Sequence, residues 1–262
     1  FYNVIFTTIF EEMYNRLFIG EKRINLVEID STNAFMKELV SVSDNEVEGL
    51  VVITESQLKG RGQQGSTWES EPRKNLTFSI YLKPNILIHN QFVLSKAVSL
   101  GITDFLIEKG LNNVKIKWPN DIYVGSRKIA GILIENLLKG NKVNSTIVGV
   151  GFNVNQSKFN SDNSPTALIN VLGKEQDLDS TLNQLLFFIE KRYILLKQQK
   201  EERIRNDYLN FLFGLGEMLS FEIGNKIVKG KILGVNSSGK LQVEINNKIE
   251  EFELKEIKFL IN

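Results

Sequence analysis

Apolar residues along the chain form short runs of strand length, separated by longer stretches with helical spacing. The runs at residues 50–54 and 76–82 are typical of buried strands. In residues 91–109 apolar side chains recur every three or four positions, which predicts a helix facing the core. A shorter helix is predicted over residues 34–40 and a long helical segment over residues 182–213. Further strands are predicted over residues 26–29, 114–118, 122–124, 128–135 and 145–150.

Strands interrupted by helices, with turns short enough for hairpins, predict an α+β domain with a mixed sheet flanked by helices. Beyond Gly214 and Gly216 the pattern changes to short strands joined by turns rich in Gly and Asn, which predicts a small SH3-like β-barrel. These strands are expected at residues 218–223, 226–235, 240–245 and 249–254. We therefore expect an N-terminal extension (1–28, with a short strand and a helix within 1–20), a main domain (29–213) and a C-terminal domain (214–262).

Residues 60–68, with the sequence GRGQQGSTW, form a glycine-rich polar loop between two predicted core strands. Loops in this position commonly carry binding residues. The literal spacing G-x-G-x-x-G does not indicate a dinucleotide site, because such a site must open a helix and needs an acid about 20 residues further on. No long amphipathic helix follows Gly65, and the next acid after Glu71 is Asp104.

Composition limits the function classes. Lys and Arg total 32 and Asp and Glu total 31, and no basic stripe of a nucleic-acid-binding protein is visible. The absence of Cys excludes thiol chemistry and suits a reducing cytoplasm. The single His89 lies in a predicted loop, so histidine-based catalysis is not expected. No run approaches the roughly 18 apolar residues of a membrane span.

Four polar segments fall at predicted strand ends or turns: residues 30–33, 57–68, 117–121 with 127–131, and 149–155. Asp30 or Ser31 is expected to cap the helix that follows. The segments supply amides, hydroxyls and cations but few acids and no free nucleophile; the cations are Arg61, Lys117, Arg127 and Lys128. This inventory suits the binding and polarisation of phosphates and carboxylates.

The same segments resemble the biotin protein ligases in five blocks, in the order and spacing of that family. The blocks are DSTN (30–33), Gln57 followed by GRGxxGxxW (60–68), KWPND (117–121), RKIAGILIE (127–135) and GVGFNVN (149–155). The resemblance spans residues 30–155 and also covers a small C-terminal barrel.

The resemblance implies a fold like that of class II synthetases and the activity of a biotin–[acetyl-CoA-carboxylase] ligase. Biotin and ATP would form biotinyl-5′-AMP and pyrophosphate, with Mg²⁺ accompanying ATP. A lysine of a biotin carboxyl carrier protein would then take the biotin and release AMP. The location implied is cytoplasmic, and the state a monomer or homodimer. With only 29 residues ahead of the first matched block, a DNA-binding repressor domain is not expected. The charge balance and the apolar pattern likewise predict neither nucleic-acid nor membrane binding.

Carried over by position, the resemblance assigns catalysis to Arg61, Lys128 and Lys117. It places around biotin Ser31, Thr32, Asn33, Gln57, Gly60, Arg61, Gly62, Gln63, Lys128 and Gly131. It places around ATP Arg61, Trp68, Lys117, Asn120, Lys128 and Asn153, with Asp121 as a metal ligand.

The chain departs from the family pattern in its glycine-rich loop. Gln63, Gln64 and Ser66 stand where many members have basic residues, so retention of the adenylate is expected to rest on Arg61 and Lys128. Two alternative functions remain open on the sequence: a lipoate ligase with related chemistry, and a binding module whose loops hold a protein partner. The second leaves the cations Arg61, Lys117 and Lys128 unexplained.

Overall fold

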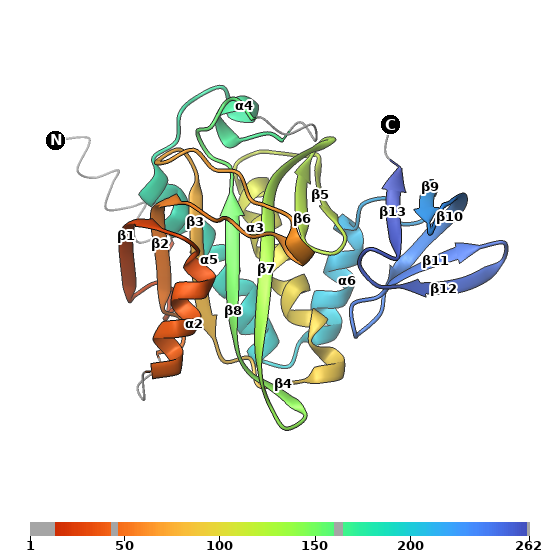
Figure 1. Ribbon diagram of the computed structural model, residues 1–262, viewed down its shortest axis with the longest axis horizontal. Helices are drawn as coiled ribbons and strands as arrows, with labels where there is room; N and C mark the ends of the chain where they lie inside the picture. The colour runs from red at the N-terminus through yellow and green to blue at the C-terminus, as the bar shows by residue number, and fades with distance from the viewer. Residues whose placement is uncertain (1–13, 43–46, 160–164, 261–262) are drawn as a thin grey trace.

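The computed structural model describes residues 14–42, 47–159 and 165–260. The strand and helix expected within residues 1–20 lie largely outside these ranges. The main domain is built on an eight-stranded mixed sheet in the order β1-β2-β3-β8-β7-β6-β5, with β4 paired to β8 (Figure 1). The strands are β1 (Arg23–Ile29), β2 (Val51–Gln57), β3 (Leu76–Leu82), β4 (Ile86–Leu87), β5 (Val114–Lys117), β6 (Asp121–Val124), β7 (Arg127–Lys139) and β8 (Lys142–Phe152).

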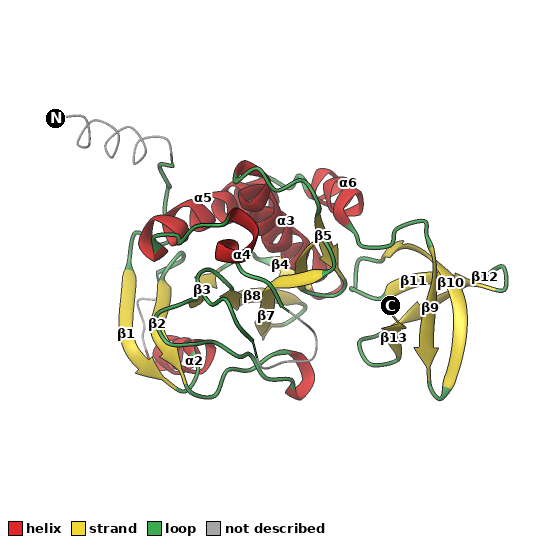
Figure 2. Ribbon diagram, turned by 90° about the horizontal axis from the view of Figure 1, so that it is seen from above, coloured by secondary structure: helices red, strands yellow, loops and turns green. Residues whose placement is uncertain are grey.

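One face of this sheet is covered by helices and the other is partly open. Helices α3 (Phe92–Glu108), α5 (Leu178–Lys197) and α6 (Glu201–Phe211) lie on one face, whereas α2 (Thr32–Val42) lies on the opposite face (Figure 2). The core beneath α2 is small and contains Met36, Val40, Val52, Tyr81 and Ile147. The uncovered part of the α2 face is therefore free to form a site.

The C-terminal part forms a separate five-stranded antiparallel sheet in the order β12-β11-β10-β9-β13. Its strands are β9 (Met218–Ile223), β10 (Lys226–Val235), β11 (Leu241–Ile245), β12 (Lys248–Phe252) and β13 (Ile257–Leu260). The separate sheet agrees with the predicted hairpin ladder, and its closure into an SH3-like barrel stays a prediction.

Three expectations about the elements need correction. β1 belongs to the main sheet and pairs in parallel with β2 as far back as Arg23, so a boundary after residue 28 would cut a strand. The helical segment expected over residues 182–213 is two helices, because the chain turns at Gln199, which has a φ of 59°. A short helix, α4 (Leu168–Leu172), and strand β13 were not expected.

Candidate functional site

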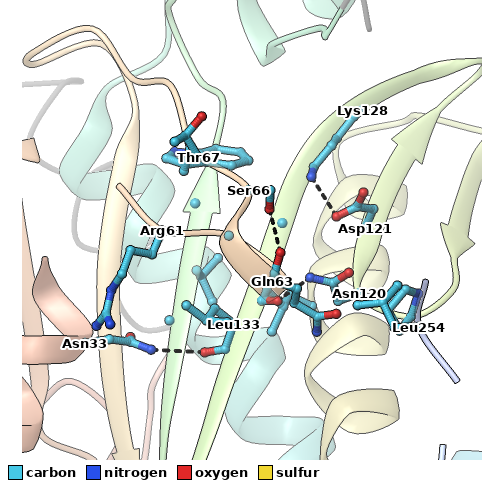
Figure 3. Close-up of a pocket in the computed structure, with 18 of the residues that line it drawn as sticks. Asn33, Arg61, Gln63, Ser66, Thr67, Asn120, Asp121, Lys128, Leu133 and Leu254 are labelled. Atoms are coloured by element: carbon cyan, nitrogen blue, oxygen red, sulfur yellow. Dashed lines mark hydrogen bonds and ion pairs between the residues drawn. The ribbon is translucent and has the colours of Figure 1, made fainter. Parts of the chain in front are cut away.

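The predicted site residues gather around one cavity of about 560 Å³ on the α2 face of the main sheet (Figure 3). Such a volume is typical of small-molecule sites. Of the fifteen residues predicted, all but Gly60 and Asn153 line it. They come from the α2 N-terminus, the end of β2, the glycine-rich loop, and strands β5, β6 and β7. Polar segments that are distant in the sequence thus lie around one cavity.

A network of hydroxyl and amide groups forms one end of the cavity. Ser31 caps α2, with its hydroxyl accepting from the Ala34 N–H at 3.4 Å, while Asp30 instead pairs with Lys59. Gln57 Oε1 accepts from the Thr32 N–H at 2.9 Å, and Ser79 donates to Asn33 Oδ1 at 2.6 Å. Ser31, Thr32, Asn33 and Ser79 are buried and Gln57 is half-buried, so the protein sets the hydrogen-bonding directions of this network before any ligand arrives.

The glycine-rich loop closes on itself beside this network. The Gly62 N–H donates to Ser66 O at 2.7 Å, and the Trp68 N–H to Gly60 O at 3.0 Å. Gly60 does not line the cavity, and a Cβ at this position would collide with the Trp68 carbonyl. Arg61 extends from the loop toward Asn33 (Figure 3), with its side chain half exposed. The loop therefore brings a cation to the rim of the hydroxyl–amide network.

Trp68 ends the loop and lies flat against two strands that carry glycine at the point of contact. A Cβ at Gly151 on β8 would collide with the indole ring, and one at Gly131 on β7 would lie 3.2 Å from it. The indole Nε1–H of Trp68 is buried and has no hydrogen-bond partner, unlike its main-chain N–H. The two glycines thus leave room for an aromatic surface over the sheet.

Cations and one carboxylate form the other side of the cavity. Lys128 Nζ lies 2.7 Å from Asp121 Oδ1 and 5.5 Å from the centre of the Trp68 ring. Lys117 lies over the rings of Tyr123 and Phe259. Burial lowers the pKa of Lys117; Asp121 opposes that shift and Lys128 adds to it. Asn120 is fixed by a hydrogen bond to the Ile132 carbonyl.

Asn153 was predicted near the nucleotide but does not line the cavity. It is buried, and its Nδ2 donates to the Thr166 carbonyl at 3.0 Å. Its main-chain N–H donates to Ile129 O, next to Lys128. In this structure Asn153 holds the chain around β7 rather than facing the cavity.

The C-terminal sheet contributes cavity residues that the sequence analysis missed. Part of the wall comes from the β12–β13 connection and β13, namely Leu254, Lys255, Ile257, Lys258 and Phe259. Trp118 Nε1 donates to the Gly239 carbonyl at 2.8 Å, which ties the β5–β6 turn to that sheet. No local sequence signal shows that residues more than 100 positions apart share one wall.

The fold and the cavity define a small-molecule-binding α+β protein whose site joins a fixed hydroxyl–amide network to a set of cations. Such a site suits a substrate with a polar head group and an anionic end.

Comparison with known proteins shows which proteins this chain is similar to. Residues 27–153 match the model of the biotin/lipoate A/B protein ligase family. It is 28% identical over 227 residues to the bifunctional ligase/repressor BirA of Bacillus subtilis, covering 85% of this chain and 69% of the relative. It is 26% identical to the biotin–[acetyl-CoA-carboxylase] ligase of Mycobacterium tuberculosis, covering 87% and 86% of the two chains.

A solved structure is similar over nearly the whole chain. The biotin protein ligase from Aquifex aeolicus in complex with biotin and ATP superposes with a TM-score of 0.74 and 28% identity, covering 91% of this chain and 98% of the other. The α+β fold expected from the sequence is therefore confirmed.

Proposed function

We propose that this protein is an ATP-dependent biotin protein ligase, a biotin–[acetyl-CoA-carboxylase] ligase. In the first step an oxygen of the biotin carboxylate attacks the α-phosphorus of ATP. The bond to the β-phosphate oxygen breaks, and biotinyl-5′-AMP and pyrophosphate form. In the second step a lysine amine of a carrier protein attacks the acyl carbon, giving an amide and releasing AMP and a proton.

The observation that carries this proposal is the joining of two unlike surfaces in one cavity. The fixed network around Thr32, Asn33 and Gln57 suits an uncharged head group rich in hydrogen-bonding atoms, such as the ureido ring of biotin. Ser31, Gly62, Gln63 and Gly131 line the same cavity. Arg61 and Lys128 suit the carboxylate and the α-phosphate, where they would neutralise charge as the anhydride forms.

The nucleotide belongs on the side formed by Trp68, Lys117 and Asn120. The indole over Gly131 and Gly151 offers a flat apolar surface for a base, and Lys117 offers a cation for phosphate. Asn153 supports this side indirectly, because its main-chain N–H donates to the Ile129 carbonyl on β7.

Mg²⁺ would accompany ATP and offset the charge of its phosphates. Mg²⁺ is generally bound by one or two carboxylates together with substrate phosphates. Asp121 lines the cavity and fits that role, although its carboxylate now pairs with Lys128. In the described part of the chain no three His, Asp or Glu side chains cluster, so the phosphates would supply most of the ligands.

Biotin is favoured over lipoate as the acyl group. The chain's relatives include ligases named for biotin, and a dithiolane ring has no N–H or carbonyl for the Thr32–Asn33–Gln57 network. The partner is a biotin carboxyl carrier protein of a biotin-dependent carboxylase.

The remaining assignments follow from this reaction. The reaction needs ATP, which agrees with a cytoplasmic location. No helix in the described ranges is long and apolar enough to cross a membrane.

We propose a catalytic domain ending near residue 213, where the chain leaves α6 through Gly214.

The decisive experiment is ATP–pyrophosphate exchange with biotin, and in parallel with lipoate and octanoate. Exchange that depends on biotin, followed by biotinylation of a carrier lysine, is expected. Exchange with lipoate or octanoate alone would assign the protein to the other branch of the family. No exchange with any of the three acids would favour a binding module.

A further inference from the structure

The Glu135 carboxylate lies at the end of the hydrogen-bonded network in the cavity. Glu135 follows Leu133 by two positions on β7, so the two side chains point to the same face of the sheet. Asn33 Nδ2 donates to Glu135 Oε2 at 2.7 Å and to the Leu133 carbonyl at 3.2 Å. Both amide hydrogens of Asn33 are therefore used, and Glu135 accepts the shorter of the two bonds.

Counting hydrogens gives this network a direction. Ser79 Oγ lies 2.6 Å from Asn33 Oδ1 and 2.8 Å from Thr32 Oγ1. The Ser79 hydroxyl has one hydrogen, and Asn33 Oδ1 can only accept. Ser79 therefore donates to Asn33, and Thr32 must donate to Ser79. Hydrogen-bond donation therefore runs from Thr32 through Ser79 and Asn33 to the carboxylate of Glu135.

The direction decides what Thr32 offers to a ligand. With its hydrogen given to Ser79, Thr32 Oγ1 presents lone pairs to the cavity and needs an N–H or O–H donor. Its alternative partner, Gln57 Oε1, is farther away at 3.3 Å and already accepts from the Thr32 main-chain N–H. A cyclic urea supplies such an N–H donor, whereas a dithiolane ring supplies none.

The same carboxylate oxygen also faces the glycine-rich loop. Arg61 Nη2 lies 4.0 Å from Glu135 Oε2. Asn33 can lie between the strands because β8 carries Gly149 there, where a Cβ would collide with Asn33 Oδ1. Glu135 is thus placed to act on the head-group network and on the loop cation together.

We propose that Glu135 is a positioning residue that determines specificity. It fixes the Thr32–Ser79–Asn33 chain in the direction that accepts a ureido N–H, and it faces Arg61 at the cavity rim. This inference rests on the proposed biotin ligase function. It assigns to Glu135 no contact with the substrate, so its effect must pass through Asn33, Ser79 and Thr32.

The test measures biotin binding by calorimetry without ATP, using Glu135→Gln. Gln keeps the size of the side chain but loses the charge, and its amide can donate as well as accept. Loss of one hydrogen bond to a charged group predicts biotin affinity about tenfold weaker or more. The matched control is Glu55→Gln, which removes a surface ion pair in which Glu55 lies 2.7 Å from Arg73. This variant should leave biotin affinity unchanged.

A double-mutant cycle with Thr32→Val separates positioning from general damage. Thr32→Val removes the hydroxyl at which the hydrogen-bonded series begins. In the Thr32→Val background, Glu135→Gln should therefore weaken biotin affinity by less than about twofold. An equally large loss in both backgrounds, or wild-type affinity for Glu135→Gln alone, would overturn the proposal. If Glu135→Gln does not fold, Ser79→Ala breaks the same chain in the middle and must also weaken biotin binding.

The two proposals fail in different ways. If wild-type protein neither binds biotin nor supports biotin-dependent exchange, the proposed function is wrong. If wild-type protein does both while Glu135→Gln and Ser79→Ala bind biotin like wild type, only the role of Glu135 is wrong.

Discussion

Lys128 lies between a carboxylate and an aromatic ring in the cavity. Asp121 lies 2.7 Å from its Nζ and the Trp68 ring centre lies 5.5 Å away. A phosphate arriving at the cavity would meet an ammonium already placed by these neighbours. Preplaced charge of this kind acts on the transition state without the cost of reorganisation.

Replacing Lys128 with Ala should therefore affect adenylation far more than biotin binding. Losing one charge-assisted contact to the transition state costs about 2–4 kcal/mol, a fall in pyrophosphate exchange of roughly a hundredfold or more. Calorimetry should show biotin affinity close to wild type. The control is Lys139→Ala at the exposed end of the same strand. Near-native exchange by Lys128→Ala would remove Lys128 from the reaction.

Most residues that the sequence predicted for the site line the cavity, but their contacts with one another could not be predicted. Arg61, Lys117 and Lys128 fall in local motifs, so their chemistry could be predicted from short segments. The ion pair between Asp121 and Lys128 depends instead on the register of β6 and β7. Glu135 was seen only as the end of a motif, because its role depends on a contact with α2.

At the scale of elements, the glycine-rich loop has few anchors to the rest of the protein apart from Trp68. Its main-chain hydrogen bonds join Gly62 to Ser66 and Gly60 to Trp68, within the loop itself. Glycine loses more entropy on ordering than other residues, so a fixed loop conformation is costly. A carboxylate or phosphate bound by Arg61 would offset that cost.

The loop should therefore be mobile without ligand and ordered over bound biotin or adenylate. Limited trypsin digestion tests this at Lys59 and Arg61, both exposed. We expect quick cleavage of the empty protein and slow cleavage with biotin and ATP. ATP alone serves as the control for nucleotide effects. Equal cleavage rates in all conditions would mean that the loop is preformed.

Most elements could be predicted because their apolar patterns are strong. The bounds of β3, β9 and β10 agree with the sequence pattern, and α3 differs from it by one residue at each end. The short α4 was missed because five residues carry too little periodicity. The break between α5 and α6 was missed because charged residues continue through it. Some of these residues contact other elements, as Glu201 does with Asn90, and such contacts could not be read from the local sequence.

At the scale of the whole molecule, the C-terminal sheet is attached to the main domain by specific polar contacts. Buried Lys96 on α3 donates to the Val235 carbonyl at 3.0 Å and lies over the rings of Phe92 and Tyr208. Trp118 donates to the Gly239 carbonyl. The sheet is thus held beside the part of the cavity that we propose for the nucleotide.

Deleting the chain from Leu215 onward should impair acyl transfer more than biotin binding. The head-group network contains no residue beyond Glu135, whereas β13 lines the other side of the cavity. Calorimetry with biotin and a carrier biotinylation assay measure the two effects, and a thermal melt checks folding. Phe259→Ala is the milder companion variant. A folded truncation that biotinylates carrier at full rate would show the sheet to be dispensable.

Lys96 gives the stability of the molecule a pH dependence. Burial, with Arg205 nearby, lowers the pKa of Lys96 to about 8. Below pH 8 the folded and unfolded chains both bind this proton. Between pH 8 and the ordinary lysine pKa of about 10.4 the unfolded chain binds more, so this group raises the free energy of unfolding as pH rises.

The comparison that isolates this effect is wild type against Lys96→Met. Wild type should gain stability relative to the variant from pH 8 to 10, by at most about 1.4 kcal/mol per pH unit. Denaturant unfolding at several pH values measures the difference. A stability difference that does not change with pH would mean that Lys96 keeps its proton in the folded protein.

The wall contributed by β13 has a consequence for how the protein is made. Thr32 and Phe259 line one cavity although synthesis of the chain separates them by more than 200 residues. A nascent chain released before Ile257 would carry the whole head-group network but an open nucleotide side. Premature termination even late in the message would thus leave the residues proposed for biotin in place while removing part of the wall proposed for the nucleotide.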